Sequence, residues 1–241
     1  MAHFSEDPEL LRVFREGLDP HLITAQAIFG QDVDPHGDER GIGKTVNFAI
    51  GYGAGAKKVA QVLSLAGYPT DVATTKEYLA LVQGFYRGYY RWSQRTKDIA
   101  RRKGSVRTMG GRRRRLKSAF KDTANWKLVG YGERQAVNSI IQGSAADIIR
   151  RTMVHVTRYE PDVVLLAQVH DELIFEDRMR MGKVAEVLKG IEYEATVGHG
   201  FDLRVPLLFS PQYTDTWAAK GDGVGYEELV GEEGDDETAD L

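Results

Sequence analysis

Two carboxylates occur side by side in the sequence, at Asp171 and Glu172, directly after His170. Apolar runs of strand length precede and follow them, at residues 163–169 and 173–176, which predicts a β-hairpin with the three polar residues at its tip. Paired carboxylates on a stiff support suit a hard cation, which prefers oxygen ligands. An ordinary solvated turn would have the same composition, because Asp is common in turns, and the segment alone does not decide between the two.

A second group of residues recurs at intervals of four within residues 38–52, namely Arg40, Lys44, Phe48 and Tyr52. On an α-helix each step of four turns about 40° and rises about 6 Å, so the side chains form one stripe about 18 Å long. Two cations, which bind phosphate oxygens, are followed by two rings that can stack on a base or a sugar. This order is typical of a nucleoside triphosphate site along a helix. An ordinary amphipathic helix with a basic end has the same spacing.

Together these residues resemble the family A DNA polymerases, the bacterial polymerase I type. The pattern Arg-x-x-x-Lys-x-x-x-Phe-x-x-x-Tyr-Gly, followed later by Val-His-Asp-Glu, is similar to the second and third polymerase motifs of that family. Residues 19–30 resemble the segment ahead of the nucleotide-binding helix, and residues 133–149 resemble the helix that touches primer and template. The order and spacing of these motifs extend the resemblance through nearly the whole of residues 1–217.

The resemblance implies template-directed transfer of a deoxynucleotide from a dNTP to a primer 3′-hydroxyl, with two Mg²⁺ ions. The catalytic residues would be Lys44 and the metal ligands Asp171 and Glu172. The residues implied for binding the incoming dNTP are His21, Arg40, Lys44, Phe48 and Tyr52. The residues implied for contacting primer–template DNA are Arg112, Arg113, Arg114, Arg115, Arg134, Asn138, Gln142 and His170.

The first motif of the family is matched only at its Ala-His end, at residues 2–3, and its metal-binding Asp would lie upstream of Met1. The resemblance therefore predicts a C-terminal polymerase fragment, such as one piece of a split phage polymerase. One bridging carboxylate and the thumb would come from an N-terminal polymerase chain, so the isolated chain is expected to be inactive.

We expect an α+β fold, with a mostly helical fingers subdomain and a palm fragment whose small antiparallel sheet carries the His-Asp-Glu hairpin. The expected divisions are a palm-proximal helix at residues 1–14, fingers at 15–132, the C-terminal portion of the palm at 133–220 and a disordered acidic tail at 221–241.

The net charge of −3 hides an uneven distribution, because residues 221–241 hold nine acidic residues and no Lys or Arg. Residues 1–220 therefore carry 32 bases against 26 acids, and a basic body of this kind favours a nucleic-acid binder. The absence of cysteine excludes disulfides and zinc–thiolate sites. No apolar run is long enough to span a membrane, and we expect a protein of the bacterial or phage-infected cytoplasm.

The helices expected from periodicity and end signals lie at residues 6–16, 21–29, 38–52, 54–66, 74–102, 133–158 and 179–197, and a strand is expected at 203–209. Thr74 has the spacing of a capping box. The aromatic stripe from Leu79 to Trp92 is interpreted as core. The glycines at 41, 43 and 51 weaken their helix by roughly 1 kcal/mol each, which predicts mobility. The core faces expected on two helices are Leu10, Leu11 and Phe14, and Ile141, Ala145, Ile148, Ile149 and Met153.

The basic residues between 101 and 121 are placed in a glycine-interrupted loop and interpreted as contacts to backbone phosphates. A solvated charged face or a nuclear localisation signal would have the same composition. Residues 51–56 match a dinucleotide fingerprint with residues 45–50 as its strand, which would indicate a nicotinamide-dependent oxidoreductase. A single-subunit RNA polymerase fragment and a non-catalytic DNA-binding remnant are two more hypotheses, and Glu172 favours the DNA enzymes over the RNA enzymes.

Overall fold

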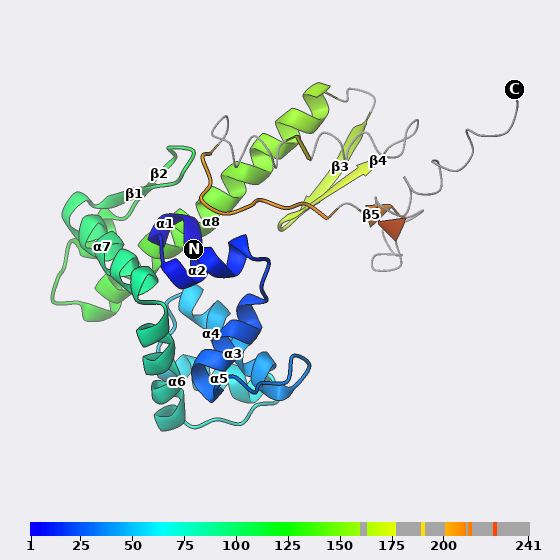
Figure 1. Ribbon diagram of the computed structural model, residues 1–241. Helices are drawn as coiled ribbons and strands as arrows, with labels where there is room; N and C mark the ends of the chain where they lie inside the picture. The colour runs from blue at the N-terminus through cyan, green and yellow to red at the C-terminus, as the bar shows by residue number, and fades with distance from the viewer. Residues whose placement is uncertain (160–162, 177–188, 191–200, 211, 214–223, 226–241) are drawn as a thin grey trace, which may run out of the picture. The chain divides into compact units, whose positions relative to one another are not determined.

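The computed structural model describes residues 1–159, 163–176, 189–190, 201–210, 212–213 and 224–225 (Figure 1). Most of this part of the chain is helical, and its strands form three antiparallel sheets of two strands each. The α+β class expected from the sequence is confirmed. The chain divides into two compact units, Met1–Ser144 and Ala145–Leu241. No helix among the described residues is long and apolar enough to cross a lipid bilayer.

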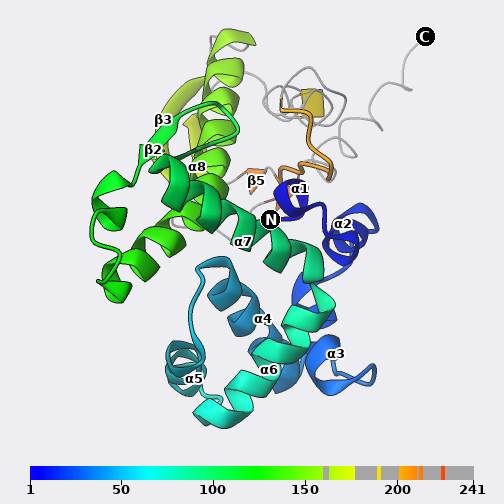
Figure 2. The same cartoon turned by 90° about the vertical axis from the view of Figure 1, so that its left-hand side faces the viewer.

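Unit 1 holds seven complete helices, one β-hairpin and the first part of a long helix. Its elements are α1 (Ala2–Ser5), α2 (Pro8–Arg15), α3 (Pro20–Phe29), α4 (Asp38–Gly51), α5 (Ala56–Leu65), α6 (Val72–Phe85), α7 (Arg87–Lys103), β1 (Ser105–Arg107), β2 (Arg113–Arg115), a 3₁₀ turn (Lys117–Phe120) and the start of α8 (Trp126–Tyr159). Figure 2 shows α3, α4, α5 and α6 as one group, with α7 running from that group to the β1–β2 hairpin.

Aspartate side chains cap the start of three of these helices. Asp7, Asp19 and Asp71 are the N-caps of α2, α3 and α6, and in each case the carboxylate accepts backbone N–H groups of the first turn. The capping box expected at Thr74 is wrong. Asp71 accepts the N–H of Thr74 at 2.8 Å, so α6 begins at Val72, earlier than the sequence indicated.

Asp7 caps a second helix as well. Its Oδ1 accepts the N–H groups of Glu9 and Leu10 at 3.1 Å each, and its Oδ2 accepts those of Gly88 and Tyr89 at 2.6 and 3.2 Å. The residue is only 1% exposed. A Cβ at position 88 would lie 2.7 Å from the Cα of Asp7, so this approach requires glycine. One carboxylate thereby joins the starts of α2 and α7.

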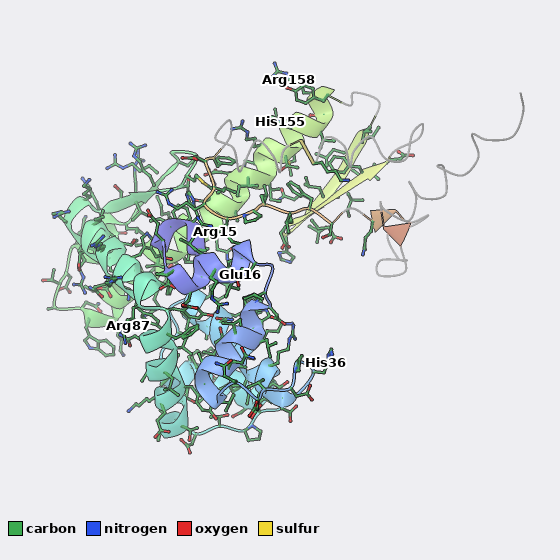
Figure 3. All side chains as sticks on the ribbon, in the orientation of Figure 1. Arg15, Glu16, His36, Arg87, His155 and Arg158 are labelled. Atoms are coloured by element: carbon green, nitrogen blue, oxygen red, sulfur yellow. The ribbon has the colours of Figure 1, made fainter. Side chains whose placement is uncertain are left out.

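The single helix expected over residues 74–102 is in fact two helices, α6 and α7. The helix is interrupted at Tyr86, where φ is −94° and ψ is 53°. Arg87, labelled in Figure 3, donates from Nε to the carbonyl of Gly84 at 2.8 Å. The break has a physical reason, because the N–H groups that follow it bond to Asp7 instead of to carbonyls one turn earlier.

The aromatic stripe of α6 and α7 packs into the core, as expected. Val82 is fully buried, and Tyr86 and Tyr89 are each 2% exposed. The hydroxyl of Tyr89 donates to the carbonyl of Ile50 at 3.1 Å, and the hydroxyls of Tyr86 and Thr24 lie 2.9 Å apart. These two hydrogen bonds satisfy the polar ends of the rings and connect α7 and the α6–α7 junction to α4 and α3.

Two helices bury faces that differ in part from those expected. On α2, Leu10 is buried as expected, but Val13 is fully buried whereas Phe14 is 42% exposed. On α8, Ala145 is exposed and the other residues of the predicted apolar face are half-buried. The buried positions of α8 are occupied mainly by small side chains. They include Ala136, Val137, Ser144, Asp147, Thr152 and Val156. Ala136 packs in a cluster with residues from α7, β1 and the segment after β2.

The glycines of α4 mark close approaches to neighbouring elements. A Cβ at Gly43 would overlap the carbonyl oxygen of His21 and lie 2.9 Å from the backbone nitrogen of Ala25, so α3 and α4 pack backbone to backbone. A Cβ at Gly41 would overlap the ring of Tyr68. The sequence indicated only the cost of these glycines to the helix. Residues 45–50 are helical, which contradicts the strand required by the dinucleotide-binding hypothesis.

The basic segment expected as a loop contains a β-hairpin. β1 pairs with β2 in the register Ser105 to Arg115, Val106 to Arg114 and Arg107 to Arg113. Residues opposite each other share a face of the ladder, so Val106 faces the core cluster and the other two pairs face away from it. Leu116 closes the hairpin, because its N–H donates to the carbonyl of Gly104 at 2.8 Å and its side chain is buried.

The described residues of unit 2 form the end of α8 and two small sheets. β3 (Val164–Val169) pairs with β4 (Glu172–Glu176), and β5 (Gln212–Tyr213) pairs with β6 (Val224–Gly225). Its core cluster joins Val156 and Val163 to Phe175, Leu207 and Phe209. The strand expected at 203–209 is wrong, since this segment alternates in burial but pairs with no strand among the described residues.

Two expectations fall largely outside the described residues. Of the helix expected at 179–197, only residues 189–190 are described, and they are helical. Of the acidic tail at 221–241, only β6 is described, and it belongs to a sheet.

Candidate functional site

The exposed face of α4 carries the stripe found in the sequence. Arg40 is partly exposed, Lys44 is exposed, and the rings of Phe48 and Tyr52 are each 53% exposed. The opposite face of α4 is buried, including Val46 and Ala49 at 0% and 8% exposure. Two large rings held in water beside two cations form a surface that can contact both an anion and a flat apolar group.

The start of α3 fixes the first cation of this stripe. The carboxylate of Asp19 uses both oxygen atoms, because Oδ1 accepts the N–H groups of His21 and Leu22 at 2.8 and 3.3 Å while Oδ2 accepts from Nε of Arg40 at 2.6 Å. Partial burial alone would raise the pKa of Asp19, but the hydrogen bonds from Arg40 and the two N–H groups outweigh it and lower the pKa. Asp19 therefore stays ionised and holds Arg40 beside α3.

His21 lies between Asp19 and the stripe. Asn47 donates to the carbonyl of Pro20 at 2.8 Å and lies 3.3 Å from Nδ1 of His21, and the His21 ring is 5.7 Å from the ring of Phe48. Burial lowers the pKa of His21 below its ordinary value; the Asp19 carboxylate opposes this shift, and the Arg40 and Lys44 charges add to it. At neutral pH the imidazole is therefore neutral, with one donor and one acceptor nitrogen.

Three polar residues behind the stripe, Asp19, Thr24 and Asn47, were given no role in the site by sequence reasoning. Thr24 lies 2.9 Å from both Oδ1 of Asn47 and the hydroxyl of Tyr86, and thus connects the core to the residue that orients His21. Asp19 had a readable signal, because Asp-Pro is typical of a helix start. Asn47 and Thr24 had none, since their partners lie far away in the sequence.

The first part of α8 brings a second group of predicted residues close to the end of α4. A Cβ at Gly53 would lie 3.2 Å from Cγ of Arg134, so the Arg134 stem packs against the turn after Tyr52. One turn further along, Oδ1 of Asn138 is buried and has no hydrogen-bond partner among the described residues. Gln142 is exposed. An orphaned amide oxygen of this kind is expected where a ligand or water completes the site.

The basic hairpin reaches the same helix. Arg112 donates from Nη2 to the carbonyl of Gly143 at 2.7 Å, and the N–H of Met109 donates to Oγ of Ser144 at 2.9 Å. The three arginines of β2, Arg113–Arg115, are all exposed. Of the four arginines predicted to contact DNA here, Arg112 is hydrogen-bonded to α8, and Arg113–Arg115 are exposed to solvent.

In unit 2, the His-Asp-Glu segment forms the connection between β3 and β4. Val169 pairs with Glu172, so only His170 and Asp171 make the turn, and Glu172 is the first residue of β4. His170 has a positive φ of 57°, and Gln168 donates to its carbonyl at 3.0 Å. The sequence prediction put all three residues at the tip, and the structure puts two there.

The donor set of this turn fits a hard cation in kind, since Asp171 is exposed and Glu172 is half-exposed. It is incomplete in number. Among the residues that the structure describes, no group of three or more His, Asp and Glu could surround a metal ion. A divalent cation held here would need further oxygen ligands from a substrate, water or other carboxylates.

Comparison with known protein families matches residues 1–219 to the family described as DNA polymerase family A. The chain belongs to this family. Among curated family A relatives, DNA polymerase I of Rhizobium leguminosarum is 33% identical over 228 residues, which cover 90% of this chain and 21% of the relative. The thermostable DNA polymerase I of Thermus filiformis is 36% identical over 220 residues, which cover 84% of this chain and 25% of the relative.

A solved family A structure has a similar fold. It is the POL domain of Pol1 from M. smegmatis in complex with DNA primer-template and dNTP, with a TM-score of 0.72 and 31% sequence identity, and the match covers 86% of this chain and 35% of that one. This chain thus spans about a fifth to a quarter of the length of the curated relatives that it matches. The names of these relatives favour a DNA polymerase over a single-subunit RNA polymerase.

Proposed function

We propose that this chain forms the nucleotide-binding and template-binding part of a DNA-directed DNA polymerase. It would bind the incoming dNTP and primer–template DNA, and it would supply one metal-binding aspartate to two-metal nucleotidyl transfer. The observation that carries the proposal is the stripe on α4, where two cations and two exposed rings follow one another beside the half-buried imidazole of His21.

The proposed dNTP contacts follow from the chemistry of each side chain. Arg40 and Lys44 would bind the triphosphate through charge-assisted hydrogen bonds, with neutral His21 adding a donor. Phe48 would pack against the sugar and Tyr52 would stand near the template base. As negative charge builds on the phosphates, the Lys44 contact strengthens, so Lys44 would stabilise the transition state more than the bound substrate.

The carboxylates of unit 2 would hold the metal ions. Asp171 would be a metal ligand with Glu172 beside it, and further oxygen ligands would complete the coordination of the ions. Bound Mg²⁺ would activate the primer hydroxyl and stabilise the leaving oxygens. The exposed position of Asp171 supports this role, because a carboxylate that holds a metal ion for catalysis must be accessible to substrate.

The proposed DNA contacts are of two kinds. Arg134, Asn138, Gln142 and His170 would contact primer and template near the nascent base pair. Amide side chains can both donate and accept, so they suit the minor-groove acceptors that all base pairs share. The unpartnered Oδ1 of Asn138 supports this assignment. The arginines at 112–115 would contact backbone phosphates without reading sequence.

Primer extension tests the proposal. The 241-residue chain is incubated with primer–template, dNTPs and Mg²⁺, alone and together with a polypeptide that carries a family A thumb and first motif. We expect primer extension by the mixture. Asp171→Asn in the mixture should abolish extension while leaving DNA binding intact. Absence of extension by the mixture would contradict the proposed function, and extension by the Asp171→Asn mixture would contradict the metal role.

A further inference from the structure

The helix α7 is attached to α4 near its start and to α8 in its last turn. Tyr89 is 2% exposed and donates from its hydroxyl to the carbonyl of Ile50, in the last turn of α4, at 3.1 Å. Arg101 forms an ion pair with Glu133 of α8. Twelve residues separate Tyr89 from Arg101, and a helix rises about 1.5 Å per residue, so the two attachments lie about 18 Å apart along α7.

Three consecutive residues of α8 contact three different elements. A Cβ at Gly132 would lie 2.6–2.9 Å from side-chain atoms of the 3₁₀ turn. Glu133 is paired with Arg101 of α7, and the stem of Arg134 packs against Gly53, directly after Tyr52. Successive residues of a helix point about 100° apart, so these contacts hold this part of α8 from three sides.

The two partners of the ion pair differ in exposure. The side chain of Glu133 is 16% exposed, whereas that of Arg101 is 49% exposed. Oε1 of Glu133 is buried, and among the described residues Arg101 is the only cation paired with it. A buried carboxylate that loses its cation costs several kcal/mol, whereas a half-exposed guanidinium can be solvated. The pair therefore restricts where α8 can lie against α7.

We propose that Glu133 is a positioning residue for nucleotide incorporation. Its pair with Arg101 keeps α8 in place against α7. Arg134 and Asn138, on the same helix, thereby stay beside the end of α4, where Tyr52 would stand near the template base. This inference rests on the proposed function, because it concerns the alignment of the nascent base pair.

The pair gives Arg101 a role different from the one that the sequence suggested. Arg101 was grouped with the basic residues that contact backbone phosphates, but its guanidinium is paired with a carboxylate of the protein. The pair would act without touching DNA or nucleotide. The residues proposed to bind the triphosphate, Arg40 and Lys44, lie in the first half of α4 and do not depend on it. The expected signature is a lower maximal rate with little change in the half-saturating dNTP concentration.

The kinetic test measures single-turnover incorporation by the reconstituted mixture over a series of dNTP concentrations. Arg101→Gln leaves Glu133 unpaired. It should lower the maximal rate about tenfold, because a misplacement of about 1 Å can cost about 100-fold and a smaller shift is expected here. Arg101→Lys keeps the positive charge and should recover most of the rate. Arg101→Gln/Glu133→Gln should be no slower than Arg101→Gln, because both changes remove the same pair. Glu9→Gln, which removes an exposed ion pair within α2, is the matched control and should keep the unmodified rate.

A distance measurement on the full chain alone tests the positioning directly. The sequence contains no cysteine, so nitroxide labels can be attached specifically at Lys57→Cys and Tyr131→Cys, two exposed positions on α5 and α8. Arg101→Gln should widen the distribution of distances between the labels, and Arg101→Lys should restore it. Circular dichroism confirms that each variant is folded. If Arg101→Gln did not fold, Glu133→Gln, which leaves only a half-exposed arginine unpaired, takes its place in both assays.

The inference would be overturned by an unchanged distance distribution in Arg101→Gln, or by a maximal rate equal to that of Glu9→Gln. A loss confined to dNTP affinity would also overturn it, because Arg101 would then act on the triphosphate. The proposed function fails separately, when the unmodified mixture does not extend a primer. In that case the distance measurement alone decides whether the pair positions α8.

Discussion

Replacing Asp7 by alanine would remove a carboxylate that caps α2 and α7 together. Four backbone N–H groups would lose their acceptor, and the site is 1% exposed, so water cannot replace it without rearrangement. Loss of an N-cap costs about 1 kcal/mol, which gives about 2 kcal/mol for two helices. Leaving buried donors unsatisfied adds about 1–3 kcal/mol. We expect Asp7→Ala to lower the free energy of unfolding by about 3–5 kcal/mol.

The assay is urea unfolding of the full chain followed by far-ultraviolet circular dichroism. Asp71→Ala is the matched control, because Asp71 caps only α6 at an exposed position and should cost clearly less. Asp7→Asn is the informative second variant. Its amide presents one oxygen and one NH₂ group, so one of the two helices must lose its acceptor. A midpoint for Asp7→Ala equal to that of Asp71→Ala, or a fully stable Asp7→Asn, would refute the shared-cap reasoning.

Three further predictions concern the site. In the reconstituted enzyme, Lys44→Ala should slow nucleotide incorporation at least about 100-fold with little change in duplex affinity, and intact incorporation with lost duplex binding would make Lys44 a DNA contact. Because the pKa of Asp19 is lowered, its ionised form stabilises the fold at pH values above the ordinary pKa of 3.8. The unmodified chain should therefore have a higher free energy of unfolding than Asp19→Asn. This difference, measured by denaturant titration, should shrink as the pH falls below 3.8. Gly43→Ala should destabilise the chain by about 1–3 kcal/mol, because the added Cβ would overlap the backbone of α3. Gly84→Ala should stabilise the chain by up to about 1 kcal/mol, because a Cβ there meets open space. Thermal unfolding that ranked the two variants in the opposite order would contradict the packing argument.

Local periodicity was sufficient to predict several parts of this fold. The stripe on α4 follows from a spacing of four, and β3 and β4 begin and end within a residue of the expected apolar runs. Both patterns involve residues that are close together in the sequence, so they can be recognised without knowledge of distant contacts.

The features that sequence reasoning missed depend on distant partners. The break at Tyr86 is caused by Asp7, which lies 81 residues from Gly88 in the sequence. The β1–β2 hairpin was missed because a strand of three residues is too short to show a periodic pattern, and all three residues of β2 are arginine. The network that links Thr24 and Asn47 joins α3 to α4 across the interface that Gly43 allows, and no spacing rule reports such a contact.

The carboxylate of Asp7 also sets an order of events during synthesis on the ribosome. The start of α2 leaves the ribosome long before the segment that contains Gly88, because 81 residues separate the two. Closing a loop of that length costs about 4 kcal/mol of chain entropy, and collapse of the intervening helices reduces this cost. Oδ1 of Asp7 can cap α2 as soon as that helix forms, whereas Oδ2 gains its two N–H partners only after α7 has emerged. Amide hydrogen exchange at Gly88 and Tyr89 would report that late docking step, since those protons become protected only when the two ends meet.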